Sequence, residues 1–296
     1  MTKMLQAYRS FSNSKSNFLK RAFAALFLCV VKAAFVGSIV GLSTSCTLSS
    51  QDLEFKRAEE AAKAGKNEEA LRHYKAVVEK YVNTQLAISS AQQAARISHY
   101  ELKKFPDAIT YYRHVIMYAP SDKDRIDAQK KIADLFFSQT LDYQRAIQEF
   151  SHLLELPHTP KEDETYRFAI ARSYFYLNDF FQSTIEIDRI LALHPSDDVA
   201  FEALLLKANI FLTTKKLDDA ISALRDLIAK YPVRSKAETI GLVLAICYEE
   251  KKDFGKAIET LESIRNEYPR KGFIEGKIKA LKERQTLLPG ARGLKK

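Results

Sequence analysis

The stretch GKNEEALRHYKAVVEKYV, residues 65–82, decides the fold, because altered versions of it return five more times along the chain. The later versions begin at residues 103, 140, 177, 215 and 251. Each has a small residue near its middle, and consecutive small residues are 37 or 38 positions apart: Ala70, Ala108, Ala146, Ser183, Ala220 and Ala257. A fixed period of this length predicts an array of equivalent structural units.

Each version of the stretch has the apolar spacing of one helix face. A large apolar residue follows the small residue by four positions, as Tyr74 follows Ala70, and another comes three positions later, as Val77 does. This i, i+4, i+7 pattern predicts an amphipathic helix. Four of the six stretches end at a proline, which cannot continue a helix: Pro120, Pro195, Pro232 and Pro269.

A second helix is predicted before each of these. This preceding helix has a small residue of its own: Ala58, Ala95, Ala133, Ala171, Ala208 and Ala245. It precedes the small residue of the following helix by 12 positions in four units, and by 13 positions in units two and three. We expect the additional residue to lengthen the turn between the two helices, in ELKKFPDA (101–108) and SQTLDYQRA (138–146).

The paired pattern resembles the tetratricopeptide repeat (TPR), in which small residues let two helices approach and large ones fill the gap to the next pair. The resemblance implies an all-α, right-handed TPR solenoid of about six helix pairs over residues 53–269. The period exceeds the usual ~34 residues, and the chain has no tryptophan. Residues 270–288 are expected to form a capping helix, and residues 289–296 a disordered tail.

The first 45 residues differ in composition from the rest. They contain six basic residues, no acidic residue, and two apolar runs at 23–31 and 33–42 that are separated by Lys32. This order predicts a secretory signal peptide over residues 1–45. An uncleaved inner-membrane helix is the alternative, although it would bury Lys32 at a cost of about 2.5–3.5 kcal/mol.

Cys46 follows the apolar run in GLSTSCTLSS, residues 41–50. This context resembles the lipobox of bacterial lipoproteins, which are cut before a cysteine that then carries lipid, although Ser43 stands where that motif has an aliphatic residue. The resemblance implies lipidation at Cys46, with residues 46–52 as a lipidated tether. Cys247 is the only cysteine after the tether, so the repeats have no disulfide partner for it.

Charge and motifs exclude several functions. The whole chain has a net charge of +9, but the part from Cys46 onward has 40 basic and 37 acidic residues, and no basic block that would suit nucleic acid. The six histidines form no HExxH motif, and the sequence has no CxxC, P-loop, GxGxxG or GxSxG motif. We therefore expect a non-enzymatic protein that has no cofactor, no metal and no nucleic-acid partner.

The first helices of the pairs are expected to line a concave, protein-binding groove. Residues at groove positions include Glu59, which begins a series of alternating charge, and a predicted binding set of Arg96, Asp134, Phe137, Phe168, Arg172, Phe175 and Asn209. Two interpretations remain open. Either Glu59, Arg96, Asp134 and Arg172 form a charge ladder between helices, or the set binds an extended peptide or a helix of another protein.

The leader and the repeats together resemble TPR lipoproteins of bacterial envelopes, of which the BamD-type lipoproteins of β-barrel assembly are the nearest kind. The resemblance implies a scaffold for other envelope proteins, anchored by lipid at the periplasmic face of the outer membrane, since Thr47 rather than aspartate follows Cys46. The alternative is a periplasmic TPR adaptor for cell-wall or motility machinery, held at the inner membrane by an uncleaved helix.

Overall fold

The computed structural model describes residues 49–287. The predicted signal peptide at 1–45, the lipidation site at Cys46 and the predicted tail at 289–296 lie outside the described residues. The chain divides into two units, residues 1–56 and 57–296. Of the first unit, the structure describes only Ser49–Lys56, which contains the beginning of α2. Between residues 49 and 287 all regular structure is helical, and none of these helices combines the length and apolar character needed to cross a membrane.

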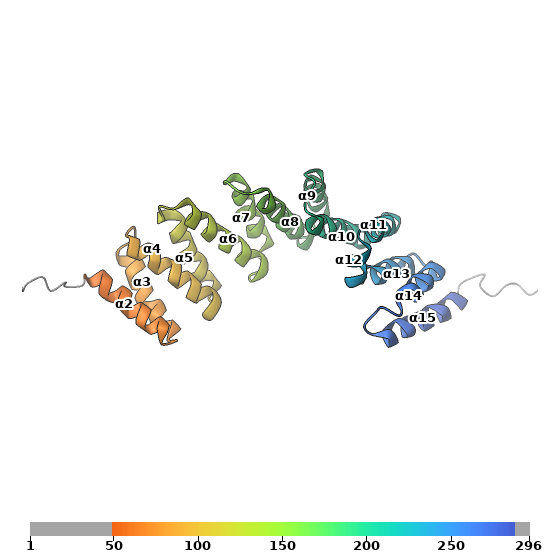
Figure 1. The fold of residues 1–296 in the computed structure, drawn as a ribbon, viewed down its shortest axis with the longest axis horizontal. Coiled ribbons are helices and arrows are strands. Elements are labelled where there is room, and N and C mark those ends of the chain that lie inside the picture. Colours follow the sequence, from red (N-terminus) through yellow and green to blue (C-terminus); the bar gives the residue numbers. More distant parts are fainter. Residues whose placement is uncertain (1–48, 288–296) are drawn as a thin grey trace, which may run out of the picture. The chain divides into compact units, whose positions relative to one another are not determined.

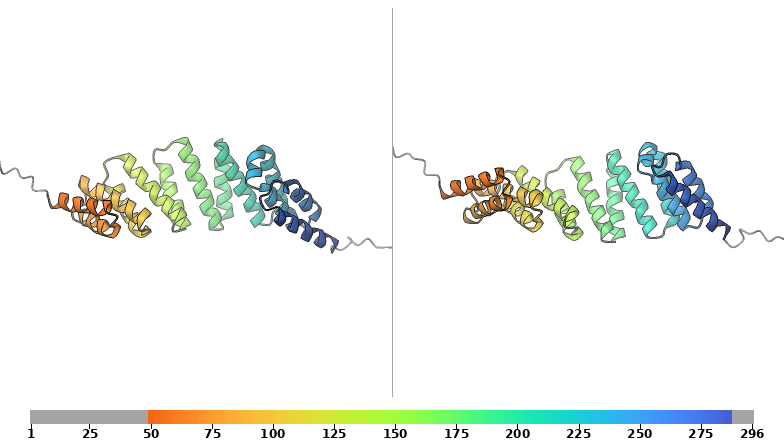
Figure 2. Two further views of the ribbon diagram at one scale, coloured as in Figure 1. Left: turned by 60° about the horizontal axis from the view of Figure 1, so that its bottom comes forward. Right: turned by 90° about the horizontal axis from the view of Figure 1, so that it is seen from below.

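The helices follow one another as pairs, in each of which we call the first helix A and the second helix B (Figures 1 and 2). The pairs are numbered one to six as hairpins, and the A helix of hairpin six is split in two. Their bounds are α2 Ser50–Lys63 and α3 Asn67–Lys80; α4 Gln85–Arg96 and α5 Phe105–Tyr118; α6 Asp122–Ser138 and α7 Tyr143–Glu155; α8 Pro160–Tyr176 and α9 Phe180–Ala192; α10 Asp197–Thr213 and α11 Leu217–Lys230; α12 Pro232–Ala237, α13 Ile240–Glu250 and α14 Phe254–Ile264.

The core is built from the residues that define the sequence repeat. Every small A-helix and B-helix residue of the repeat is at most 1% exposed, and the large residues four positions further are at most 8% exposed. Ser183 replaces the usual alanine in hairpin four, and its hydroxyl donates a 2.8 Å hydrogen bond to the carbonyl of Ala171 on the facing helix. Ile264 is the one member of the third apolar position that is only half-buried.

The turns between A and B helices share one left-handed residue each: Gly65, Lys103, Leu141, Asn178, Lys215 and Lys252. The predicted lengthening of two turns is correct only for hairpin three, where residues 139–142 connect the helices. In hairpin two the turn keeps its ordinary length. The additional residue is absorbed by a π-helical turn, η1 (Ile97–Glu101), at the end of α4.

The A helix of hairpin six is broken. In hairpins three to five this helix is a continuous 17 residues. In hairpin six, Pro232 starts the six-residue α12, and α13 begins only at Ile240. Thr239 lies between them with a φ of +56°, a strained conformation for a β-branched residue. Pro232 therefore ends one helix, as predicted, and also begins another.

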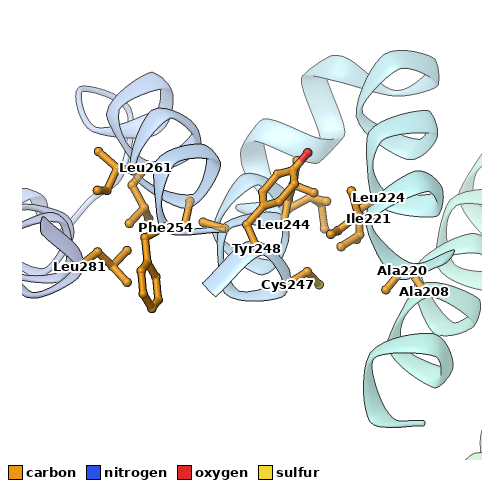
Figure 3. Close-up of a cluster of buried hydrophobic side chains, with 14 of the residues drawn as sticks. Ala208, Ala220, Ile221, Leu224, Leu244, Cys247, Tyr248, Phe254, Leu261 and Leu281 are labelled. Atoms are coloured by element: carbon orange, nitrogen blue, oxygen red, sulfur yellow. The ribbon is translucent and has the colours of Figure 1, made fainter. Parts of the chain in front are cut away.

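The helix α15 (Lys271–Thr286) packs against α14 after the sixth hairpin. It buries Ile274, Ile278 and Leu281 in the same cluster as Leu261 of α14. Figure 3 shows how this cluster runs from α11 across α13 to α14 and α15, with Leu244 and Tyr248 between the flanking helices. The polar remainder of α15 faces solvent, as a terminal capping helix requires.

Candidate protein-binding site

A pocket of about 370 Å³ lies between α6, α7 and α8, and four of the seven predicted groove residues line it. They are Asp134, Phe137, Phe168 and Arg172. Helical spacing explains the grouping, because 134 and 137 lie on one face of α6, and 168 and 172 lie on one face of α8. The walls also include the aromatic rings of Phe150 and Tyr166, so the pocket is apolar below and charged at its edges.

Arg172 lies among three aromatic rings at the pocket. Its guanidinium lies over the rings of Phe137, Phe168 and Tyr176, at 4.9, 5.9 and 5.9 Å from their centroids. It also donates a 3.2 Å hydrogen bond to the hydroxyl of Tyr176. Among residues 49–287 no carboxylate forms an ion pair with it. The arginine is thus held in place by aromatic rings, while its charge stays available to a ligand.

The aromatic rings around Arg172 extend across two hairpins. Phe137 lies 5.9 Å from Tyr143 and 6.3 Å from Tyr176, measured between ring centroids. Tyr143 and Tyr176 stack at 4.7 Å. Since these residues come from α6, α7 and α8, the rings join hairpin three to hairpin four and form a continuous apolar surface beside the pocket.

An ion pair closes one side of the pocket. Nζ of Lys130 donates a 2.6 Å hydrogen bond to Oε1 of Glu162. Glu162 also accepts hydrogen bonds from the N–H and the hydroxyl of Thr159, as the acidic member of a capping box at the start of α8. The hydrogen bond from Lys130, followed by those from Thr159, lowers the pKa of Glu162 to about 2. The same bond raises the pKa of Lys130.

Asp134 has a different environment. Its side chain is accessible to water, yet protein surrounds the carboxylate closely enough that burial raises its pKa, against the opposing effects of Lys131 and Lys130. No hydrogen bond or ion pair to this carboxylate is formed within residues 49–287. The pocket therefore presents one carboxylate and one guanidinium that are not paired with each other.

The other three predicted residues lie elsewhere. Arg96 is exposed on α4, where it bonds to Gln93 at 3.2 Å and lies 3.7 Å from Glu101. Phe175 is half-buried at the edge of the core of hairpin four, where it packs against Phe180 with 5.7 Å between the ring centroids. Asn209 is half-buried on α10. The ion pairs described for residues 49–287 do not join Glu59, Arg96, Asp134 and Arg172 into a ladder.

The predicted binding set does not include Lys130, Glu162 and Tyr166, although the sequence places Lys130 at a groove position. Lys130 lies four residues before Asp134, so helical spacing places it on the same face. The pattern Thr-Pro-Lys-Glu at 159–162 marks Glu162 as a helix-capping residue. The sequence does not predict the contact between Lys130 and Glu162, because they are 32 positions apart, on different hairpins, with two turns between them.

Residues 49–287 contain no candidate metal site and no reactive thiol. No group of three or more His, Cys, Asp or Glu side chains there is arranged to hold a metal ion. Cys247 is fully buried, and burial raises the pKa of its thiol to about 11, so the thiol stays protonated and unreactive.

Two segments of the chain, residues 168–235 and 242–270, match models described as tetratricopeptide repeat. Comparison with curated protein sequences gives no significant match. Among solved structures, a tetratricopeptide repeat protein from Parabacteroides merdae is 18% identical, with a TM-score of 0.50; the match covers 80% of this chain and 90% of that one.

Two further structures are similar in fold. The C-terminal part of a TPR repeat-containing protein from Cytophaga hutchinsonii is 17% identical, with a TM-score of 0.54, covering 78% of this chain and 89% of that one. A chain of the Naa15/Naa10 structure bound to HypK-THB is 16% identical, with a TM-score of 0.59, covering 79% and 34%. This chain therefore folds as an all-α TPR solenoid with tetratricopeptide repeats at 168–235 and 242–270, a fold of protein-interaction scaffolds that are generally non-enzymatic.

Proposed function

We propose that this chain is a protein-binding scaffold, and that the A-helix face of hairpins three and four binds an extended segment of another protein. The observation that carries the proposal is Arg172, whose guanidinium lies on three aromatic rings in the pocket lining and has no carboxylate partner among the described residues. Arginine and aromatic residues are the side chains that dominate binding energy at protein interfaces.

The chemistry of the pocket suits a peptide. Arg172 can donate to a carbonyl or carboxylate of the bound segment, and Asp134 can accept from an N–H group. Between them, the walls formed by Phe137, Phe150 and Phe168 offer an apolar space for one side chain. An extended segment supplies these three kinds of contact together, because backbone groups and side chains alternate along it.

Purification of bound proteins from detergent-solubilised membranes tests this function. The Arg172→Glu variant is expected to lose at least one protein that the wild type retains, because the site loses its unpaired positive charge. The matched control is Lys279→Glu, the same charge change at an exposed position of α15, far along the sequence from the pocket. Retention of the same proteins by all three forms would contradict the proposal.

We further propose that the scaffold acts with β-barrel assembly proteins in the bacterial envelope, anchored by lipid on Cys46 at the periplasmic face of the outer membrane. The proposal is supported by the basic and apolar leader, by the small residues before Cys46, and by the repeats that start soon after it. Two acyl chains give firm anchoring, since each buried CH₂ contributes about 0.8 kcal/mol.

Metabolic labelling with a radioactive fatty acid tests the anchor. Wild type is expected to take up label and Cys46→Ala to lose it, whereas Cys29→Ala, a change within the leader, is expected to keep it. An unlabelled wild-type chain that remains in the inner membrane would contradict lipidation and favour the adaptor with an uncleaved helix. Recovery of β-barrel assembly proteins after crosslinking would support the pathway, and their absence would contradict it.

A further inference from the structure

Another cavity in the described residues is lined by different helices from those of the proposed peptide site. It measures about 700 Å³ and is bounded by two B helices, α11 and α14, with α12 and α13 between them. The apolar part of its lining is formed by Ile228, Leu244, Tyr248, Ile264 and Tyr268. Its volume falls within the range of binding sites in proteins, about 300–1,000 Å³.

The break in the A helix of hairpin six lies in the wall of this cavity. Thr239, with its left-handed backbone, and Gly241 both line it. Gly241 has no room for a side chain, because an added Cβ would lie 2.7 Å from Cγ2 of Ile264. Backbone strain and close helix approach in a cavity wall are features of binding sites, where the surrounding structure holds them in place.

Ion pairs connect the helices on both sides of the break, α12 and α13, to neighbouring helices. Arg234 of α12 forms ion pairs with Asp198 and Glu202 of hairpin five, at 2.8 and 2.5 Å, and lies 4.2 Å from the ring centroid of Phe201. On the other side, Glu249 of α13 pairs with Lys277 and Arg284 of α15, at 2.6 and 2.5 Å. Both helices that flank the break and line the cavity, α12 and α13, are therefore tied to neighbouring helices.

The two rims carry opposite charges that lack partners. Arg225 is exposed on the α11 rim and Glu259 is exposed on the α14 rim, and neither forms an ion pair within residues 49–287. The other charges of the lining are satisfied, since Lys256 pairs with Asp253 at 3.3 Å and Lys236 pairs with Glu267 at 2.7 Å. An occupant with an acidic group toward Arg225 and a basic group toward Glu259 would complement both rims.

We propose that this groove binds a short amphipathic helix of a partner protein. Its apolar face would lie on Leu244, Tyr248 and Ile264, an acidic flank would face Arg225, and a basic flank would face Glu259. The α14 wall runs from Lys256 to Ile264, which at about 1.5 Å per residue corresponds to about 12 Å, or two turns of bound helix. Helices that bind in grooves between helices use this arrangement of apolar anchors.

Three synthetic helical peptides of equal length test the charge pattern on the purified full-length chain, by fluorescence anisotropy. All have the same leucine face, and their flanks carry glutamate on one side and lysine on the other, glutamate on both, or lysine on both. We expect the mixed peptide to bind at least fivefold more tightly than the other two. The Arg225→Glu variant is expected to prefer the all-lysine peptide, and Glu259→Arg the all-glutamate peptide.

A variant that fills the cavity tests whether the peptide binds there. Ala229 is an exposed residue of the cavity lining, and Ala229→Trp is expected to weaken binding of the mixed peptide at least tenfold. The matched control is Ala192→Trp, the same exposed position one hairpin earlier, which should bind normally. Equal binding of the three peptides, or unchanged binding by Ala229→Trp, would overturn the proposal. Self-association of the chain that Ala229→Trp abolishes would also overturn it, by assigning the groove to a second copy.

The proposals for this site and for the peptide site can be tested independently. Changes at Arg225, Ala229 and Glu259 are expected to leave Arg172-dependent binding intact, because the two sites are lined by different helices.

Discussion

At the scale of single residues, the role of an arginine in this molecule depends on whether neighbouring carboxylates neutralise its charge. Arg172 and Arg234 are both surrounded by partners, but with opposite results. Three carboxylates neutralise Arg234, which ties α12 to α10. Within residues 49–287, the guanidinium of Arg172 contacts aromatic rings and a hydroxyl but no carboxylate, so its charge is available to a ligand in the pocket. The first is a structural arginine, and the second is our candidate for binding.

The shape of the arginine side chain should matter at position 172. Arg172→Lys keeps the positive charge but loses the planar group that stacks on Phe137 and Phe168. We expect it to bind a partner recovered by the wild type about tenfold more weakly, and Arg172→Ala to bind at least as weakly. Titration of each variant with that partner measures the effect. Wild-type affinity in Arg172→Lys would show that charge alone suffices.

The acid stability of the chain should report on Glu162. Its pKa falls from an ordinary value near 4.5 to about 2, because the folded state favours the charged carboxylate. That stabilisation is complete above pH 4.5 and is lost as pH falls through 2. Glu162→Gln should therefore lower the melting temperature at pH 7, and the difference from wild type should vanish near pH 2. The same difference at both pH values would contradict this account.

Two glycines offer a matched pair for backbone conformation. Gly65 has a φ of +71° and open space around it, whereas Gly276 lies inside α15, also with open space. Gly65→Ala should destabilise by about 1 kcal/mol, because a left-handed alanine is strained. Gly276→Ala should instead stabilise by about 0.5–1 kcal/mol, because alanine favours a helix. Urea unfolding measures both, and effects of the same sign would contradict the assignment.

At the scale of helices, the sequence pattern predicts which face of each helix is buried, but not how consecutive helices are connected and packed. Spacing along one helix was enough to predict the buried faces, including Ser183 in place of alanine. It did not predict that hairpin two would absorb a residue in the π-turn at 97–101, since a helix and a turn can each accommodate one extra residue. Nor did it predict the break at Thr239, beside which Arg234 pairs with carboxylates of α10 and Gly241 lies close to Ile264 of α14.

The same limit applies to the binding site. Asp134, Phe137, Phe168 and Arg172 were predicted together because each lies on the A-helix face, which spacing determines. Phe175 lies on nearly the same face of α8, seven residues after Phe168, but about 10 Å further along the helix axis, where it packs beside Phe180 instead of lining the pocket. The pairing of Lys130 with Glu162 depends on the rotation between two hairpins, and no local pattern encodes that angle.

The capping box of α8 should contribute measurably to this helix. The Thr159 hydroxyl accepts from the N–H of Glu162 at 3.3 Å, at the first turn of the helix. Thr159→Ala should cost about 1 kcal/mol of the free energy of unfolding. Thr165→Ala, in the middle of the same helix, removes a hydroxyl that bonds only to the carbonyl of Lys161, and should cost less. Equal losses in urea unfolding would argue against the cap.

At the scale of the whole molecule, stability passes from each hairpin to the next, because helices pack mainly against their neighbours in sequence. The final helix α15 then has the role of covering the last apolar face. A chain cut after Pro269 should expose Leu261 and its neighbours, melt at a lower temperature and self-associate. A chain cut after Leu287 keeps α15 and should behave as wild type in sedimentation. Monomeric, fully stable behaviour of the shorter chain would contradict the capping role.

The central claim is that the A-helix face of hairpins three and four binds another protein, and photo-crosslinking in cells tests it most directly. A photoreactive amino acid would replace Thr165, an exposed residue of the pocket lining, or Ser222, an exposed residue of the B helix α11 that does not line a described pocket. We predict a discrete crosslinked protein from position 165 that is absent from position 222 and is lost when Arg172→Glu is added. The same crosslinks from both positions, or crosslinks at 165 that persist with Arg172→Glu, would contradict the claim.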